Sequence, residues 1–187
     1  MENLKLIKGK PSNLEGRQER ELRCYRLLDE LGIEFWSVDN PPADTMEACA
    51  AIDKVLDCLI CKNLFLCNRQ KTSFYLLMMP ANKPFKTKDL SAQINSSRLS
   101  FADKEDMLKY LDIRPGAVSV LGLMNDKDNA VKLLVDEDVL KNEYLGCHPC
   151  VNTSSLKLKT ADVFGTLLDK MHHEKTVISL PFYEIDT

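Results

Sequence analysis

The sequence predicts one mixed α/β domain of the α+β type, in which a sheet is flanked by helices. Two pairs of β-prone segments are each joined by a short polar turn, as in a hairpin: residues 63–68 with 73–79, and residues 118–124 with 131–136. Segments with helical spacing lie before, between and after these hairpins, without regular alternation of strand and helix. This order favours a mixed sheet over a doubly wound parallel one.

Length and composition fit a globular protein with a sizeable core. The chain has 187 residues, of which 44% are hydrophobic and 28% charged. We expect a basic leader over residues 1–11 and a single domain over residues 12–187. No run approaches eighteen uncharged apolar residues and the first residues lack a secretory signal, so we expect a cytoplasmic protein without a membrane partner. A net charge of −3 argues against a protein that coats nucleic acid, but permits a local basic patch.

The first part of the chain reads as helix, strand and helix. Ser12 and Glu15 fit a capping box, which predicts a helix over residues 12–31 that ends at Gly32. A strand over 33–38 and a helix over 44–56 follow. Four arginines recur in the first helix and alternate with glutamates. This pattern is typical of a salt-bridged, solvated face, and contact with RNA phosphates is the alternative. The arginines are Arg17, Arg20, Arg23 and Arg26.

The rest of the chain supplies shorter elements around the two hairpins. Residues 80–97 are polar and broken by Pro84, which indicates loops with one short helix. Helical spacing predicts a helix over 100–111, a helical turn over 136–141 and a final helix over 160–172. A terminal strand is expected over 176–180. His172 and His173, near the end of the last helix, are expected to form a surface pair.

Lys62 stands at the opening of the first hairpin, directly after the apolar segment 55–60. A lysine bordered by so much hydrophobic sequence either extends its ammonium to water or is kept for a function. The pattern alone favours an ordinary lysine at the edge of a strand. The functional interpretation therefore depends on what surrounds this lysine.

The seven cysteines are an odd number scattered through apolar segments, which favours reduced thiols over a disulfide framework. Cys58 with Cys61, and Cys147 with Cys150, have the C-x-x-C spacing of zinc ligands. Cys58 lies in an apolar run without the turn residues of a zinc knuckle, and buried thiols are commonly inert. We therefore expect no metal and no cofactor, with a structural zinc ion or a redox-active thiol pair as alternatives.

Several segments together resemble the YbaK/ProX family of trans-editing aminoacyl-tRNA deacylases, which are relatives of the editing insertion domain of bacterial prolyl-tRNA synthetases. The resemblance extends from about Gly32 to about Leu168. One departure is Val120, where the glycine loop of the family often has proline. The segments that carry the resemblance are Val38–Pro42, Lys62–Leu66, Ser100–Ala102, Pro115–Ser119, and Gly146–Pro149 with Asn152.

The resemblance implies a mixed, largely antiparallel and curved sheet flanked by helices. It also implies an ester hydrolase that deacylates mischarged tRNA in trans, with Ala-tRNA(Pro) as the favoured substrate and Cys-tRNA(Pro) as an alternative. The implied partners are the acceptor end of tRNA(Pro) and, as a second candidate, prolyl-tRNA synthetase. A binding module with the same fold but without catalysis remains a further alternative, which the absence of the loop proline permits.

The resemblance also implies roles for individual residues. Lys62 would polarise the substrate, and His148 would be its polar partner across the pocket. Backbone N–H groups near Gly116 would hold the aminoacyl ester, while Asn63 would either bind the terminal adenosine or cap its strand. The catalytic candidates are thus Lys62 and His148, and the substrate-binding candidates are Asn63, Gly116, Ala117, Ser119 and Asn152.

Overall fold

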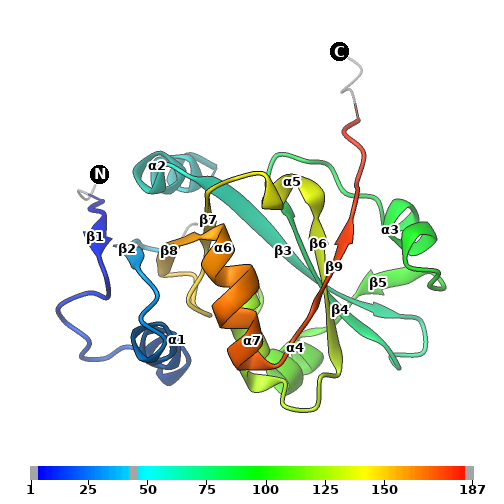
Figure 1. Ribbon diagram of the computed structural model, residues 1–187, viewed down its shortest axis with the longest axis horizontal. Coiled ribbons are helices and arrows are strands. Elements are labelled where there is room, and N and C mark those ends of the chain that lie inside the picture. Colours follow the sequence, from blue (N-terminus) through cyan, green and yellow to red (C-terminus); the bar gives the residue numbers. More distant parts are fainter. Residues whose placement is uncertain (1–3, 43–45, 184–187) are drawn as a thin grey trace.

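The computed structural model describes residues 4–42 and 46–183, with side chains omitted for residues 46–48. Its strands form one sheet in the order β1-β2-β8-β7-β3-β4-β6-β9, and β5 pairs with β3 beside this path. Three of the pairings are parallel, β3 with β7, β4 with β6 and β6 with β9, and the other pairings are antiparallel. The predicted mixed, largely antiparallel sheet with flanking helices is therefore confirmed (Figure 1).

The strands differ widely in length, and the longest pair forms the centre of the sheet. β3 and β4 are paired from Cys61 with Pro80 to Cys67 with Phe74. The strands are β1 Ile7–Lys8, β2 Phe35–Asp39, β3 Leu59–Asn68, β4 Phe74–Pro80, β5 Leu99–Phe101, β6 Val131–Asp136, β7 Tyr144–Cys147, β8 Ser154–Lys159 and β9 Lys175–Ile178.

The helices are short, and the last of them is a composite. α6 Thr160–Asp162, the π-helical turn η2 Val163–Leu167 and α7 Leu168–Met171 follow one another without a break, as the predicted final helix requires. The other helices are α1 Glu19–Glu30, α2 Met46–Leu56, α3 Thr87–Gln93, α4 Lys104–Leu111, the 3-10 helix η1 Val120–Asn125, and α5 Glu137–Leu140.

The sheet buries apolar side chains on both of its faces. Alternate residues of β3 and β4 divide between two cores, because successive side chains of a strand point to opposite faces. Phe65 and Met78 pack with α1, α4, η1 and α6–α7, whereas Leu66 and Leu77 pack with α3 and the segment after β9. α2 covers Val38 of β2 in a smaller third core. This division places Lys62 and its neighbour Asn63 on different faces of β3.

One predicted strand is wrong, and two predicted helices begin later than expected. Residues 118–124 are not a strand, because the Ser119 hydroxyl caps the N-terminus of η1 by accepting from Leu121 N (3.2 Å). The first helix begins at Glu19 rather than at Ser12, so the predicted capping box does not open it. The helix predicted over 100–111 begins only at Lys104, capped by Asp103, and the residues before it form β5 on the edge of β3.

His173 does not lie on the surface, in contrast to the prediction. It is 6% exposed and its Nε2 lies 3.0 Å from Asp126 Oδ2, while its Nδ1 lies 2.7 Å from the Met171 carbonyl. Only His172 is exposed, at the left-handed C-cap of α7. The pair therefore divides between the surface and the interior.

The arginines of α1 are engaged by polar partners. Arg17 bonds Glu21 (2.5 Å) and Asp39 (2.5 Å), and Arg26 bonds Glu19. Three of the four thus reach across to other segments, because Arg20 and Arg23 both contact Asp112 at the C-cap of α4. The arginines bridge elements of the fold, as a salt-bridged face requires, although two of them are largely covered rather than solvated.

The segment before residue 12 also takes part in the sheet. Ile7 and Lys8 form β1, which pairs with β2, and Lys8 bonds Glu34 (2.6 Å). Lys10 bonds Asp29 of α1 (2.6 Å). The division into a leader and a domain at residue 12 stays a prediction. Within residues 4–42 and 46–183, we find no helix with the length and apolar character needed to cross a membrane.

Candidate active site

Lys62 leaves β3 on the face that also carries Leu64 and Leu66. Its Nζ donates a hydrogen bond to the backbone carbonyl of Lys83, in the turn that follows β4. Burial lowers the pKa of Lys62 below its ordinary value. The ammonium is thus held by one carbonyl in a half-buried position.

Asn63 leaves the opposite face of β3, on the side of Cys61 and Phe65. Its Oδ1 is buried and has no hydrogen-bond partner within the described structure. Buried polar atoms are nearly always paired, so an unpaired acceptor requires an explanation. One explanation is that the partner is a group of the substrate.

The glycine loop meets the segment after β7. Gly116 adopts φ +88°, a backbone conformation that favours glycine, and a Cβ at this position would lie 3.9 Å from Asn152 Nδ2. Ala117 is buried in the same core as Cys147. Ser119 is completely buried and caps η1. Gly116, which is exposed, thus contacts the half-buried Asn152, while Ala117 and Ser119 are buried.

Val120 occupies the position of the proline that the family often has. Ser119 before it is extended, at φ −149° and ψ 148°, and Val120 is the first residue of η1. An extended preceding residue and a first helical position are the two conditions that proline needs. Both conditions for the usual proline are therefore met at Val120.

His148 is oriented by the strand that follows it. Its Nδ1 lies 2.9 Å from the carbonyl of Ser154. A carbonyl only accepts, so Nδ1 carries the proton and Nε2 of the neutral ring has a lone pair. Burial lowers the pKa of His148 below 6.5, which favours this neutral form at pH 7.

Asn40 joins β2 to the loop that carries His148 and Asn152. Its Nδ2 donates to the carbonyl of Asn152 (3.0 Å), and its backbone N–H donates to the carbonyl of Thr153 (3.1 Å). Asn40 is 7% exposed. From the sequence this asparagine belongs to a segment that resembles the family but has no predicted role, and its position before two prolines was the available signal.

The structure thus brings together some of the predicted residues and separates others. Gly116 lies against Asn152, which shares the loop between β7 and β8 with His148, and Asn63 leaves β3 on the side of the core that contains Ala117. Lys62 leaves the face of β3 opposite to Asn63, and no hydrogen bond or ion pair of the described residues joins it to His148.

Comparison with known proteins gives the family. The profile of the aminoacyl-tRNA editing domain matches residues 40–165. The prolyl-tRNA editing protein ProX of Acetoanaerobium sticklandii is 32% identical over 136 residues, which cover 73% of this chain and 83% of that protein. The chain belongs to the aminoacyl-tRNA editing domain family.

Other relatives of this editing domain agree in extent. The prolyl-tRNA synthetase associated domain-containing protein 1 of Xenopus laevis is 29% identical over 169 residues, which cover 88% of this chain and 98% of that protein. A crystal structure described as a proposed trans-editing enzyme for prolyl tRNA synthetase has a TM-score of 0.65. That match is 14% identical and covers 89% of this chain and 100% of the other, so it supports the fold.

In the two C-x-x-C pairs, Cys61, Cys147 and Cys150 are buried and Cys58 is half-buried. Burial raises the pKa of Cys61 to about 12 and that of Cys58 to about 11, and burial also raises the pKa of Cys147. Zinc ligands and reactive thiols must be thiolates. Among the described residues, we find no group of three or more cysteine, histidine or acidic side chains placed to hold a metal ion.

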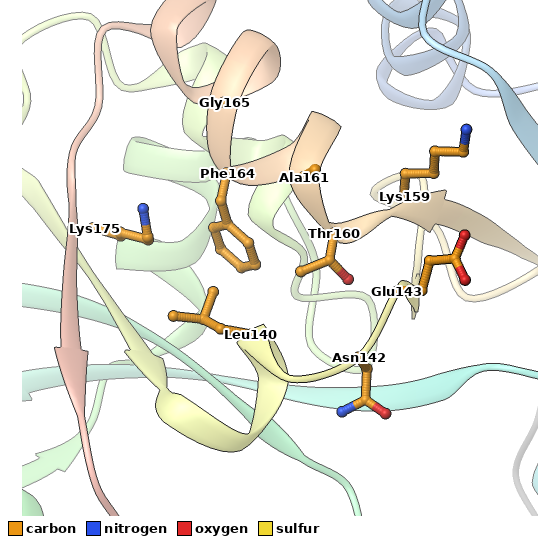
Figure 2. Close-up of a pocket in the computed structure, with 9 residues that line it drawn as sticks. All are labelled: Leu140, Asn142, Glu143, Lys159, Thr160, Ala161, Phe164, Gly165 and Lys175. Atoms are coloured by element: carbon orange, nitrogen blue, oxygen red, sulfur yellow. The ribbon is translucent and has the colours of Figure 1, made fainter.

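A groove of the editing domain lies away from these residues. It has a volume of about 550 Å³ and opens where the loop from α5 to β7 meets α6 and β9 (Figure 2). Phe164 and Leu140 form its apolar floor, and Lys175 reaches toward Phe164 from β9. None of the predicted site residues lines it. The groove is therefore separate from the candidate active site.

Proposed function

We propose that this protein hydrolyses the aminoacyl ester of mischarged tRNA(Pro) in trans, with Ala-tRNA(Pro) as the preferred substrate. The observation that carries the proposal is the fixed tautomer of His148 beside the loop of Gly116 and Asn152, in a chain that belongs to an editing family. The name of the ProX relative supports tRNA(Pro) as the tRNA.

The proposed chemistry needs a water, a base and stabilisation of the developing oxyanion. His148 Nε2 would accept the proton of the attacking water, because Nδ1 is already committed to the Ser154 carbonyl. Backbone N–H groups at Gly116 and the ammonium of Lys62 would stabilise the negative charge on the ester oxygen. Asn63 Oδ1, which has no partner within the described structure, would accept a hydrogen bond from the substrate.

Selection by size explains why such an enzyme is needed. A synthetase pocket that holds proline rejects the smaller alanine by only about 1–3 kcal/mol, because a methylene or two contributes little binding energy. A second, smaller site that excludes proline completes the selection. Ala117 and Val120 are both buried beneath the glycine loop, so they would limit the size of this second site.

The test is single-turnover hydrolysis of Ala-tRNA(Pro), Cys-tRNA(Pro) and Pro-tRNA(Pro). We expect hydrolysis of the alanyl ester and none of the prolyl ester. Lys62→Ala and His148→Gln should each reduce the rate by about a hundredfold or more, comparable to the loss of one oxyanion-hole donor. Thermal melts of both variants provide the control for folding.

Two results would contradict this assignment. Near-normal hydrolysis by folded Lys62→Ala would leave Lys62 as an ordinary lysine at the edge of a strand. Binding of the acceptor end without any hydrolysis would favour the binding module. Preference for the cysteinyl ester would keep the reaction and change the substrate.

A further inference from the structure

The carbonyl that holds Lys62 belongs to a residue with an unusual side chain. Lys83 is 1% exposed, although a lysine is seldom buried unless it is paired. Its Nζ lies 2.9 Å and 3.0 Å from the two oxygens of Asp136 and 2.7 Å from Asp138 Oδ2. It also donates to the carbonyl of Leu180 (2.8 Å). The ammonium therefore has four oxygen partners from three residues.

The buried charges around Lys83 hold it in its ionised form. Burial alone would lower the pKa of Lys83, but the carboxylates of Asp138 and Asp136 outweigh it and raise that pKa. Asp136 is itself completely buried and also accepts from the backbone N–H groups of Asp138 and Leu180. The ring of Phe182 covers the ammonium at 4.8 Å.

The backbone of Lys83 is fixed as well. Its N–H donates to the carbonyl of Pro80 (3.1 Å), at the end of β4. Pro84 follows, and proline restricts the preceding residue to extended conformations. The side chain is anchored, the N–H is bonded and ψ is restricted, so the Lys83 carbonyl has a fixed direction. It accepts a hydrogen bond from Lys62 Nζ.

We propose that Lys83 is a positioning residue for Lys62: its buried ion pair with Asp136 fixes the carbonyl that orients the catalytic ammonium. This inference rests on the proposed role of Lys62 in deacylation. A lysine side chain has several rotatable bonds, so an oriented acceptor is needed to keep its ammonium in one place. One N–H of Lys62 is used by the carbonyl, and two remain for the ester.

A purely structural role of Lys83 predicts a different experimental result. In that case the loss of Lys83 would reduce the free energy of unfolding and leave the reaction of the folded molecules unchanged. A positioning role requires a lower single-turnover rate at saturating protein, where every substrate molecule is bound. The two roles are separated by rate constants measured on folded protein.

The experiment is a double-mutant cycle between Lys83→Met and Lys62→Ala. We expect Lys83→Met to lower the saturating single-turnover rate on Ala-tRNA(Pro) by about ten- to a hundredfold, because small misplacements of catalytic groups have effects of this size. On the Lys62→Ala background, Lys83→Met should cause no further loss, since it acts through Lys62. Additive losses would overturn the proposal.

A matched control comes from another buried side-chain contact, in which His173 Nε2 lies 3.0 Å from Asp126 Oδ2. Asp126 lies before β6, whereas Asp136 ends that strand, and among the described residues no hydrogen bond or ion pair joins His173 or Asp126 to Lys62. His173→Asn should destabilise the fold and leave the saturating rate unchanged. If Lys83→Met does not fold, Lys83→Met with Asp136→Asn removes both buried charges and permits the same cycle.

The activities of the two variants distinguish a failure of this inference from a failure of the proposed function. If Lys62→Ala is inactive and folded Lys83→Met reacts at the normal rate, the inference about Lys83 is wrong and the role of Lys62 stands. If Lys62→Ala is itself active, the role of Lys62 is wrong. A ¹³C-lysine spectrum adds a readout besides activity: the Lys62 Cε resonance should shift in Lys83→Met and remain in place in His173→Asn.

Discussion

Lys62 and His148 are held by regions of opposite construction. The Lys62 side depends on buried charges, in which Lys83 and Asp136 fix a carbonyl. The His148 side has no ion pair among its described contacts and depends on backbone carbonyls, an asparagine amide and a glycine at positive φ. Charge networks and loop geometry respond differently to mutation. We therefore expect mutations of the buried charges on the Lys62 side to lower mainly the stability of the protein, and mutations on the His148 side to lower mainly its activity.

The largest effect is expected on the charged side. Asp136→Ala should reduce the free energy of unfolding by about 3–5 kcal/mol, because it leaves the Lys83 ammonium buried without its main partner. It also removes the acceptor of the Leu180 N–H and the N-cap of α5. Urea denaturation monitored by circular dichroism measures the change. A loss below about 1 kcal/mol would show that the network relaxes and that the two sides do not differ in this way.

A smaller effect on stability, with a larger effect on activity, is expected on the loop side. Gly116→Ala should cost about 1–2 kcal/mol, because φ +88° is strained for a residue with a Cβ. Deacylation should fall further than this loss explains, since the new methyl group faces Asn152. Gly32→Ala is the matched control: its φ is +64°, nothing lies within 4 Å of its Cβ, and it ends α1 away from the site. Equal activity of the two variants would contradict the role of the Gly116 loop.

The smallest effect concerns the response of the loop side to acid. The pKa of His148 is below 6.5 in the folded protein because the ring is buried, so the unfolded chain binds a proton first as the pH falls. This contribution to stability is present above pH 6.5 and is lost as the pH falls through the folded pKa. Urea midpoints of the wild type should therefore fall from about pH 7 to about pH 5, and those of His148→Gln should fall less. Parallel curves for both proteins would indicate that His148 is solvated.

The sequence predicted those parts of the fold that depend on local patterns. The central hairpin of β3 and β4 was predicted from two apolar runs around a polar turn, and the two strands pair as predicted. Residues 118–124 are equally apolar, yet from Val120 onward they form η1, in which residues 120–123 are buried and Ser119 is the cap. Periodicity does not distinguish a buried strand from a buried helical turn. Burial of this segment by the rest of the fold therefore determines that it is helical.

The candidate site was predicted as a set of segments, and its geometry was not predictable. Strand alternation alone implies that Lys62 and Asn63 lie on opposite faces of β3. The prediction of a single pocket did not take this alternation into account. Lys83 was missed because a lysine between Asn82 and Pro84 in a polar loop gives no sign of burial. Its partner Asp136 is 53 residues away, and only the parallel pairing of β4 with β6 brings them together. Long-range pairing of this kind has no local signature.

The two ends of the sheet have a consequence for how molecules of this protein meet in solution. β1 is 2 residues long and β9 is 4 residues long, and each carries a lysine, Lys8 and Lys175. Short, charged edge strands offer few unpaired N–H and C=O groups to another chain. The longer and more apolar strands, β3, β4 and β6, are all enclosed between neighbours. Strand addition at either end is therefore disfavoured, and the native sheet protects itself against edge-to-edge aggregation.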